Sequence, residues 1–560
     1  MNNIQLLSRK NISIMIRKKV RGSMEKIVVK NTCIIINDYS FGDSPKLERF
    51  FAIYEPVTHS YRYAGIYYDT DNKRLYLPRG IDIWYVEQLI GCEAYVEKNM
   101  YNKFDRYDDI RIKYLPRDED QVEALKFAIG KGVYKDTLSK SQLSINLNTG
   151  KGKTYVAIGT MSVFQIKSVI ITYSVNILKQ WKSCILEYTN ITEKEIYNID
   201  GSGSIYRLKT KSEKEINDIK VFLVTHSTIQ SYCNANGWDS LNDLFSYLKI
   251  GMKFYDEAHK NFDNMCMIDF FTNVYKTYYL TATPARSQTD ENRIYQAAFK
   301  NIYAIDLFHQ DTDPHTHYIA MRYYSRPEPQ IISKCKNKYG LDRNKYVNYI
   351  VHNERFLMMS TVVLDFIFRN ILKSIDDKLL IYIGTNQSIS EFYTWLSQAY
   401  PGTRGNVGIY TSMVSDEDKA YALTRQIILT TTKSAGDAID IKGLKCTLLL
   451  AEPFKSEILA RQTLGRTRDS NTYYIEIVDR SFIHCNKFFM LKRPVFNVYA
   501  KDCKVVDLSD ENLNDMYNKI VKAATPPIQT MGGYPETKLI KPFTIGIQEE
   551  KRIKPFTIGI

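Results

Sequence analysis

The chain has 560 residues, of which 44% are hydrophobic and 25% are charged, as in ordinary globular proteins. At roughly 150 residues per domain, this length predicts three or four domains. No apolar run approaches the roughly 18 to 20 residues of a membrane-spanning helix, so we expect no membrane association. The formal net charge of +14 favours a polyanionic partner, because Lys and Arg that neutralise phosphates release condensed counterions. Nine cysteines include no CxxC pair, which argues against a zinc knuckle and a disulfide framework and fits a reducing interior.

The first 112 residues divide into a basic arm and a β-rich segment. Residues 1–24 contain Lys and Arg but no Asp or Glu, and we expect a basic arm or extension there. In residues 25–112, turn-forming segments such as Asp69–Asn72 separate runs rich in β-branched and aromatic residues. These runs are Ile27–Ile36, Phe50–Tyr54, Arg62–Tyr68 and Arg74–Leu77. The pattern predicts a small β-rich accessory domain.

After the accessory domain, short apolar strands alternate twice with helical stretches, which indicates parallel sheets with crossover helices. The first series of expected strands is Leu143–Leu147, Ser168–Tyr173, Lys220–Val224, Met252–Tyr255 and Thr277–Leu280. The second series is Lys378–Ile383, Asn406–Tyr410, Arg425–Thr430, Lys445–Leu450 and Thr472–Val478. We therefore expect two α/β domains of similar plan, residues 113–290 and 371–495. A connector of residues 291–370 joins them, with a long helix through Asn353–Asn370.

The C-terminal segment, residues 496–560, is expected to be a flexible tail, and it contains an internal repeat. The peptide Ile540–Ile547 recurs unchanged as Ile553–Ile560. Two copies are too few for a solenoid, which needs about three stacked units. One interpretation is a duplication in a tolerant terminus, and the other is a bivalent docking peptide for a protein partner.

The first motif with a chemical signature follows the strand Leu143–Leu147. It reads Thr149-Gly150-Lys151-Gly152-Lys153-Thr154 and precedes an apolar, helix-like run. Glycines let backbone N–H groups close around phosphate oxygens at a helix N-terminus. In such a P-loop, Lys153 would neutralise the β- and γ-phosphates of ATP, and the Thr154 hydroxyl would ligate Mg²⁺. Leu147 stands where the first Gly or Ala of the pattern is usual.

The second motif is Asp256-Glu257-Ala258-His259, which follows the apolar strand Met252–Tyr255. Ligands of α/β sheets bind at the carboxyl ends of the strands, where this pair of carboxylates is expected. Asp256 suits coordination of Mg²⁺, and Glu257 suits the general base that activates the attacking water.

These motifs and their order resemble superfamily 2 DEAH-box helicases, specifically the group with XPB-like, UvsW-like and poxvirus transcript-release helicases, and a viral or phage gene is favoured. The resemblance covers Leu115 to about Asp479 and implies two RecA-like domains in tandem. Gln121 resembles the adenine-reading Gln of the Q element. Thr172 and Thr225 fall in motifs that contact a nucleic-acid strand. Motif III, with Thr281 and Thr283, and His259 would couple hydrolysis to domain movement.

The second domain carries the remaining motifs of the resemblance. Thr385 lies in a segment similar to motif IV, and Thr432, Gly436 and Asp440 lie in a segment similar to motif V. Gln462, Arg466 and Arg468 are similar to motif VI, which implies that one or both arginines act as arginine fingers on the ATP phosphates. The spacing departs from the family, since Asp469 stands where the second Arg is usual. Ala438 likewise replaces a common Gly of motif V.

The resemblance implies an ATP- and Mg²⁺-dependent helicase or translocase that unwinds, branch-migrates or remodels DNA. Single-stranded or branched DNA is the expected partner, and the expected location is the bacterial cytoplasm or the interior of a virus-infected cell. An RNA helicase or transcript-release ATPase is the alternative, because nothing in the ATPase core separates DNA from RNA. A packaging ATPase would not need the motif around Gln462 and Arg466, and it ranks third.

Overall fold

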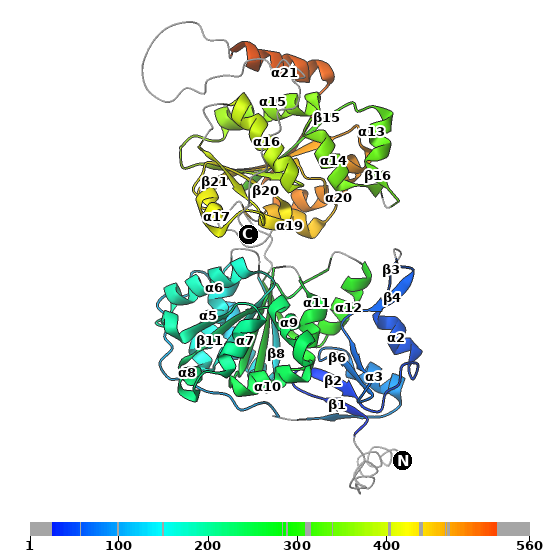
Figure 1. Ribbon diagram of the computed structural model, residues 1–560, viewed down its shortest axis with the longest axis vertical. Helices are drawn as coiled ribbons and strands as arrows, with labels where there is room; N and C mark the ends of the chain where they lie inside the picture. Colours follow the sequence, from blue (N-terminus) through cyan, green and yellow to red (C-terminus); the bar gives the residue numbers. More distant parts are fainter. Residues whose placement is uncertain are drawn as a thin grey trace, which may run out of the picture. The chain divides into compact units, whose positions relative to one another are not determined.

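The structure is a computed structural model that divides into two compact units, Met1–His309 and Gln310–Ile560 (Figure 1). It describes residues 25–523 except 56–57, 98–99, 148–150, 283, 287–288, 308–314, 339, 401–404, 436–440, 465 and 467–470. The basic arm and the repeated tail peptide lie outside these residues. No helix in the described part of the chain has the length and apolar character needed to cross a membrane.

The N-terminal part of the first unit is a five-stranded sheet of order β5-β6-β2-β1-β7 with a separate β3–β4 hairpin. The strands are β1 (Ile27–Val29), β2 (Cys33–Ile36), β3 (Ala52–Glu55), β4 (Ser60–Tyr63), β5 (Tyr67–Asp69), β6 (Arg74–Pro78) and β7 (Ala94–Val96). The helices are α2 (Pro45–Phe51) and α3 (Ile83–Ile90). The expected run Ile27–Ile36 is therefore an antiparallel hairpin, and Phe50 and Phe51 end a helix instead of starting a strand.

The remainder of the first unit is a seven-stranded, fully parallel sheet of order β10-β11-β9-β12-β13-β8-β14. Its strands are β8 (Gln142–Leu147), β9 (Ser168–Thr172), β10 (Ile196–Ile199), β11 (Val221–Thr225), β12 (Met252–Asp256), β13 (Lys276–Thr281) and β14 (Tyr303–Leu307). All five strands expected in this region are present, while β10 and β14, the two edge strands, were not expected.

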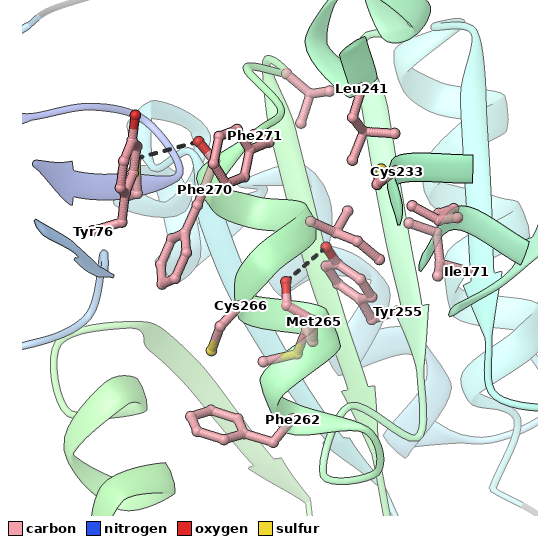
Figure 2. Packing of buried hydrophobic residues seen from close by; sticks show 14 of the residues in the cluster. Tyr76, Ile171, Cys233, Leu241, Tyr255, Phe262, Met265, Cys266, Phe270 and Phe271 are labelled. Carbon is pink, nitrogen blue, oxygen red and sulfur yellow. Dashed lines mark hydrogen bonds between the residues drawn. The ribbon is translucent and has the colours of Figure 1, made fainter. Parts of the chain in front are cut away.

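Helices flank this sheet in Figure 1. They are α4 (Glu119–Ile129), α5 (Lys153–Phe164), α6 (Val175–Tyr188), α7 (Ser202–Lys209), α8 (Glu213–Asp218), α9 (His226–Asn236), α10 (Asp239–Tyr247), α11 (Phe262–Phe270) and α12 (Thr289–Phe299). Helix α11 packs between the two sheets: Phe270 and Phe271, at and just after its end, lie beside Tyr76 of β6 (Figure 2), with ring centroids 5.9 and 5.2 Å from that of Tyr76. One continuous hydrophobic core therefore joins the accessory sheet to the RecA-like sheet.

The second unit is built on another seven-stranded parallel sheet, of order β19-β20-β18-β21-β22-β15-β23. Its strands are β15 (Thr316–Tyr323), β18 (Lys378–Ile383), β19 (Val407–Tyr410), β20 (Ile427–Thr430), β21 (Leu444–Ala451), β22 (Thr472–Asp479) and β23 (Asp502–Asp507). A short hairpin, β16 (Lys336–Asn337) and β17 (Gly340–Leu341), stands apart from the sheet. The two large sheets share one topology, which confirms the expected α/β fold with two RecA-like domains in tandem and a small β-rich N-terminal part.

The second unit includes helices from the segments expected to be a connector and a tail. They are α13 (Pro329–Lys334), α14 (Arg343–Ile350), α15 (Glu354–Asn370), α16 (Asn386–Ala399), α17 (Asp416–Leu423), α18 (Thr432–Ala435), α19 (Glu457–Leu464), α20 (Ile483–Tyr499) and α21 (Asp510–Ala523). Residues 291–370 thus supply β14 to the first sheet and β15 to the second, and residues 496–523 supply β23 and α21. The connector and the start of the tail are integral parts of the folded units.

Candidate active site

The P-loop segment joins β8 to α5 at the carboxyl edge of the first sheet. Gly152 caps α5 with φ of 86°, and a Cβ there would lie only 2.1 Å from Nε2 of Gln121. The positive φ favours glycine, and any Cβ at this position would displace the side chain of Gln121. Lys153 and Thr154 form the first turn of α5, where backbone N–H groups and the helix dipole favour an anion. Residues 148–150, which include Thr149 and Gly150, lie outside the described part of the chain.

The two carboxylates lie at the end of β12, two strands away from β8 in the same sheet: Asp256 is the last residue of the strand, and Glu257 follows it. Nζ of Lys153 lies 3.4 Å from Oε1 of Glu257, and Nδ1 of His259 lies 3.3 Å from Oε2 of the same carboxylate. Glu257 has φ of 51°, the left-handed region that disfavours side-chain-bearing residues. The fold therefore brings the expected phosphate-binding lysine and the expected base into direct contact.

The pKa values of the two adjacent carboxyls move in opposite directions. Burial raises the pKa of Asp256, and the neighbouring charge of Glu257 raises it further. Burial is the largest single influence on Glu257 and opposes its ionisation, but the charges of Lys153, His259 and Lys260 and the hydrogen bond from Lys153 together outweigh it, so the pKa of Glu257 falls below its usual value. Glu257 is thus ionised near neutral pH and able to accept a proton from water.

The structure adds Trp181, a buried residue of α6, to this site. Its indole Nε1 donates to Oδ2 of Asp256 over 2.8 Å, which orients the carboxylate. The Thr154 hydroxyl and the oxygens of Asp256 are the hard oxygen ligands that Mg²⁺ prefers, so these residues fit the expected ion. Trp181 and Asp256 are 75 residues apart in the chain, so the sequence did not indicate this contact.

Gln121 lies against the P-loop at the start of α4. Its Nε2 donates to the carbonyl of Lys151 over 3.3 Å, and its Oε1 accepts from the backbone N–H of Arg117 over 2.8 Å. Asp118 caps the helix by accepting from the backbone N–H of Gln121. The expected base-reading residue is therefore held next to the phosphate-binding loop.

His259 joins the DEAH turn to the segment similar to motif III. Its Nδ1 lies 2.8 Å from Oγ1 of Thr281, the last residue of β13. Burial lowers the pKa of His259 to about 4, so the ring is neutral near pH 7. Thr283 lies outside the described residues. One neutral hydrogen bond thus links two of the expected coupling residues.

Thr172 and Thr225 end the neighbouring strands β9 and β11 and are paired in register. The Thr172 hydroxyl donates to the carbonyl of Ser174, and the Thr225 hydroxyl accepts from the backbone N–H of Thr228. Both residues are buried. Their hydroxyls therefore shape the loops at this edge of the sheet.

In the second unit, Thr385 caps α16 and donates to Oδ1 of Asn348 over 2.9 Å, a contact that the sequence did not indicate. Thr432 begins α18, Gln462 lies on α19, and Arg466 is buried, with 7% of its surface exposed. The other expected residues of this unit lie outside the described part of the chain: Gly436, Asp440 and Arg468.

Residues 113–286 match the family described as "Type III restriction enzyme, res subunit". The chain is 21% identical over 340 residues to a transcript termination protein of Myxoma virus, covering 58% of this chain and 64% of that protein, just under two thirds of its length. It is 23% identical over 424 residues to a protein of Acanthamoeba polyphaga mimivirus whose name places it among ATP-dependent RNA helicases, covering 70% of this chain and 73% of that one.

Two solved structures are also similar. One is S. cerevisiae Dbp5 bound to RNA and ADP BeF3, with a TM-score of 0.46 and 14% identity over 72% of this chain and 93% of that chain. The other is UvsW of T4, with a TM-score of 0.34 and 14% identity over 87% of this chain and all of that chain.

A glycine-framed lysine, an adjacent pair of carboxylates and two parallel sheets of one topology define the class of P-loop proteins with tandem RecA-like domains. The motif order and the sequence matches support a superfamily 2 helicase of viral type, which is a nucleic-acid-dependent ATPase.

Proposed function

We propose that this chain is an ATP-driven motor that unwinds, branch-migrates or remodels DNA. The observation that carries the proposal is the contact between Lys153 and Glu257 beside the glycine-capped N-terminus of α5. This arrangement sets a phosphate-binding cation and an ionised base at one sheet edge, as hydrolysis of a terminal phosphate requires.

In this proposal each group has one task. The backbone of Thr149–Gly152 and the Lys153 ammonium hold the phosphates, while Gln121 recognises the adenine. Thr154 and Asp256 would hold Mg²⁺, which neutralises developing charge on the phosphates. Glu257 takes a proton from the attacking water, and Trp181 keeps the carboxylate of Asp256 in place.

The second unit supplies the remaining groups. Arg466 and Arg468 stabilise charge on the transferred phosphate. Gln462 takes part in catalysis, and Gly436 and Asp440 help to bind ATP. ATP hydrolysis is coupled to domain movement by His259, Thr281 and Thr283. The hydroxyls and backbone amides of four threonines hold the phosphates of one nucleic-acid strand without reading bases: Thr172, Thr225, Thr385 and Thr432.

RNA is the alternative substrate, and the names of two relatives support it, since one is a transcript termination protein and the other is placed among RNA helicases. ATP turnover measured with single-stranded DNA, duplex DNA, forked DNA and RNA separates the alternatives. We expect the largest stimulation by single-stranded or forked DNA and none in the Lys153→Ala variant. If RNA alone stimulated ATP turnover, RNA and not DNA would be the substrate.

Binding of either nucleic acid should weaken steeply as salt rises, with a slope of about −0.7 per phosphate contact on single strands. Little preference among base sequences is expected, because phosphate contacts carry no sequence information. A flat salt dependence with strong sequence preference would contradict a motor of this kind.

A further inference from the structure

Arg286, five residues after the end of β13, connects the DEAH turn to α12. Its Nη1 donates to the backbone carbonyl of His259. Its Nε and Nη2 lie 3.2 and 2.7 Å from Oε2 of Glu291, in the first turn of α12. Both side chains are largely buried, which strengthens a charge-assisted pair. The backbone two residues after the proposed base is therefore fixed by an arginine whose own position depends on Glu291.

The same glutamate binds the accessory hairpin. Its second oxygen, Oε1, accepts from Nη2 of Arg62 in β4. Arg62 also lies 3.0 Å from Oε1 of Glu55 in β3, and its Nη1 lies 3.3 Å from Oδ2 of Asp263 in α11. Figure 1 shows the hairpin next to α12. One arginine of the hairpin thus contacts both helices that follow the catalytic motifs, α11 after the DEAH turn and α12 after motif III.

The backbone at the DEAH turn gives these contacts a consequence. Glu257 adopts a left-handed φ of 51°, which a residue with a side chain keeps only when its surroundings hold it. The bond from Arg286 to the His259 carbonyl is one such constraint, and it lies in the same turn. Small displacements of a catalytic group can cost about 100-fold in rate. These contacts link His259 to Arg286, Arg286 to Glu291 and Glu291 to Arg62. A change at Arg62 can therefore alter the rate of ATP turnover.

We propose that Arg286 and Glu291 are positioning residues that couple the β3–β4 hairpin, through Arg62, to the DEAH turn, so that the hairpin sets the rate of ATP hydrolysis. The inference rests on the proposed function, since it concerns the base of that reaction. The hairpin also carries two exposed aromatic residues, Tyr54 and Tyr61, with ring centroids 5.3 Å apart. A displacement of this hairpin would reach the backbone of the DEAH turn through two ion pairs and one hydrogen bond.

The test compares Arg62→Ala and Glu291→Gln with a matched control, Arg293→Ala, in the full chain. Arg293 lies on the same helix and also contacts the accessory region, donating to the carbonyl of Phe50, but it does not touch Glu291 or Arg286. We expect both relay variants to lower kcat between about 10- and 100-fold with KM for ATP unchanged. The control should keep the kcat of the unmodified chain.

Thermal unfolding and a double variant complete the test. The relay requires Arg62→Ala and Arg293→Ala to have similar melting temperatures, so that the loss of kcat cannot follow from loosened packing. It also requires Arg62→Ala combined with Glu291→Gln to be no slower than Glu291→Gln alone. Equal kcat values for Arg62→Ala and Arg293→Ala, or additive losses in the double variant, would overturn it. Normal turnover by Lys153→Ala would instead overturn the proposed function.

Discussion

The two RecA-like sheets of this protein share strand order and direction but differ at their carboxyl edges. In chain order, the first strand of each sheet lies sixth across it: β8 between β13 and β14, and β15 between β22 and β23. Strand β8 leads into the glycine-capped turn of Lys153, whereas β15 ends at Tyr323 and continues into Tyr324 and Ser325. The scaffold is thus repeated, but the phosphate-binding loop is not.

The acidic residues at the equivalent strand ends differ in the same way. Asp256 ends β12 and bonds Trp181, and Glu257 follows it and contacts Lys153 and His259. Glu452 follows β21, in chain order the fifth strand of the second large sheet, and forms an ion pair with Arg343. Asp479, which ends β22, accepts from the backbone N–H and the hydroxyl of Ser325. In the second unit these carboxylates hold the protein's own loops.

The two units therefore differ in the loops at the strand ends, and such loops carry the functional groups of a shared fold. In a parallel sheet, the loops that follow the strands lie at one edge whatever their sequence. Two sheets of the same topology therefore place their loops in the same arrangement. Burial raises the pKa of both Glu452 and Asp479, as expected for carboxyls enclosed by protein groups. We therefore expect a single hydrolytic site, in the first unit.

The largest effects are expected from Lys153→Ala and Glu257→Gln, which should both abolish ATP turnover but differ in ATP binding. Loss of the Lys153 charge weakens the phosphate site, so affinity for ATP should fall. Glu257→Gln removes the base and keeps the pocket, so ATP should remain bound. Turnover and equilibrium binding of a fluorescent ATP analogue measure both properties. Near-normal turnover by Glu257→Gln would refute the assignment of the base.

The next largest effect is expected from Arg466→Ala, since an arginine finger contributes roughly 10³ to 10⁵ in rate. Hydrolysis should fall by that order with little change in ATP binding. Arg461→Ala is the matched control, because Arg461 lies on the neighbouring helix α19 and bonds Tyr499. Arg468→Ala tests the shortened spacing: a loss as severe as that of Arg466→Ala indicates two fingers, and a mild loss indicates one.

A smaller effect is expected from Glu452→Gln, which should leave ATP turnover unchanged and lower the free energy of unfolding by about 1 to 3 kcal/mol. The buried ion pair with Arg343 would lose its charge. Calorimetric titration of the unmodified chain should also find one nucleotide per chain. Two nucleotides per chain, or lost turnover in Glu452→Gln, would contradict a single hydrolytic site in the first unit.

The smallest effect is expected from Ser325→Ala, at the end of the strand equivalent to the P-loop strand. The Ser325 hydroxyl donates to Oδ2 of Asp479, and a single hydrogen bond of this kind is worth about 1 kcal/mol. Chemical denaturation should show a loss of that size with ATP turnover preserved. A defect in turnover would assign the second edge a catalytic role.

Much of the fold could be predicted because buried parallel strands form continuous apolar runs. All ten strands expected for the two large sheets are present, and α15 falls within one residue of the expected helix. Edge strands such as β10, β14 and β23 were missed because they are partly exposed and less uniformly apolar. Strand β15 was missed because its alternating sequence lies in a segment interpreted as a connector.

The P-loop and the DEAH turn could be recognised from the sequence because each is a contiguous string with a characteristic set of chemical groups. Only the tertiary structure decided which distant groups hold those strings. Trp181 reaches Asp256 across 75 residues, and Arg62 reaches Glu291 across 229. Such pairs depend on how helices and strands pack, and packing places side chains together without leaving a pattern in the spacing of the chain.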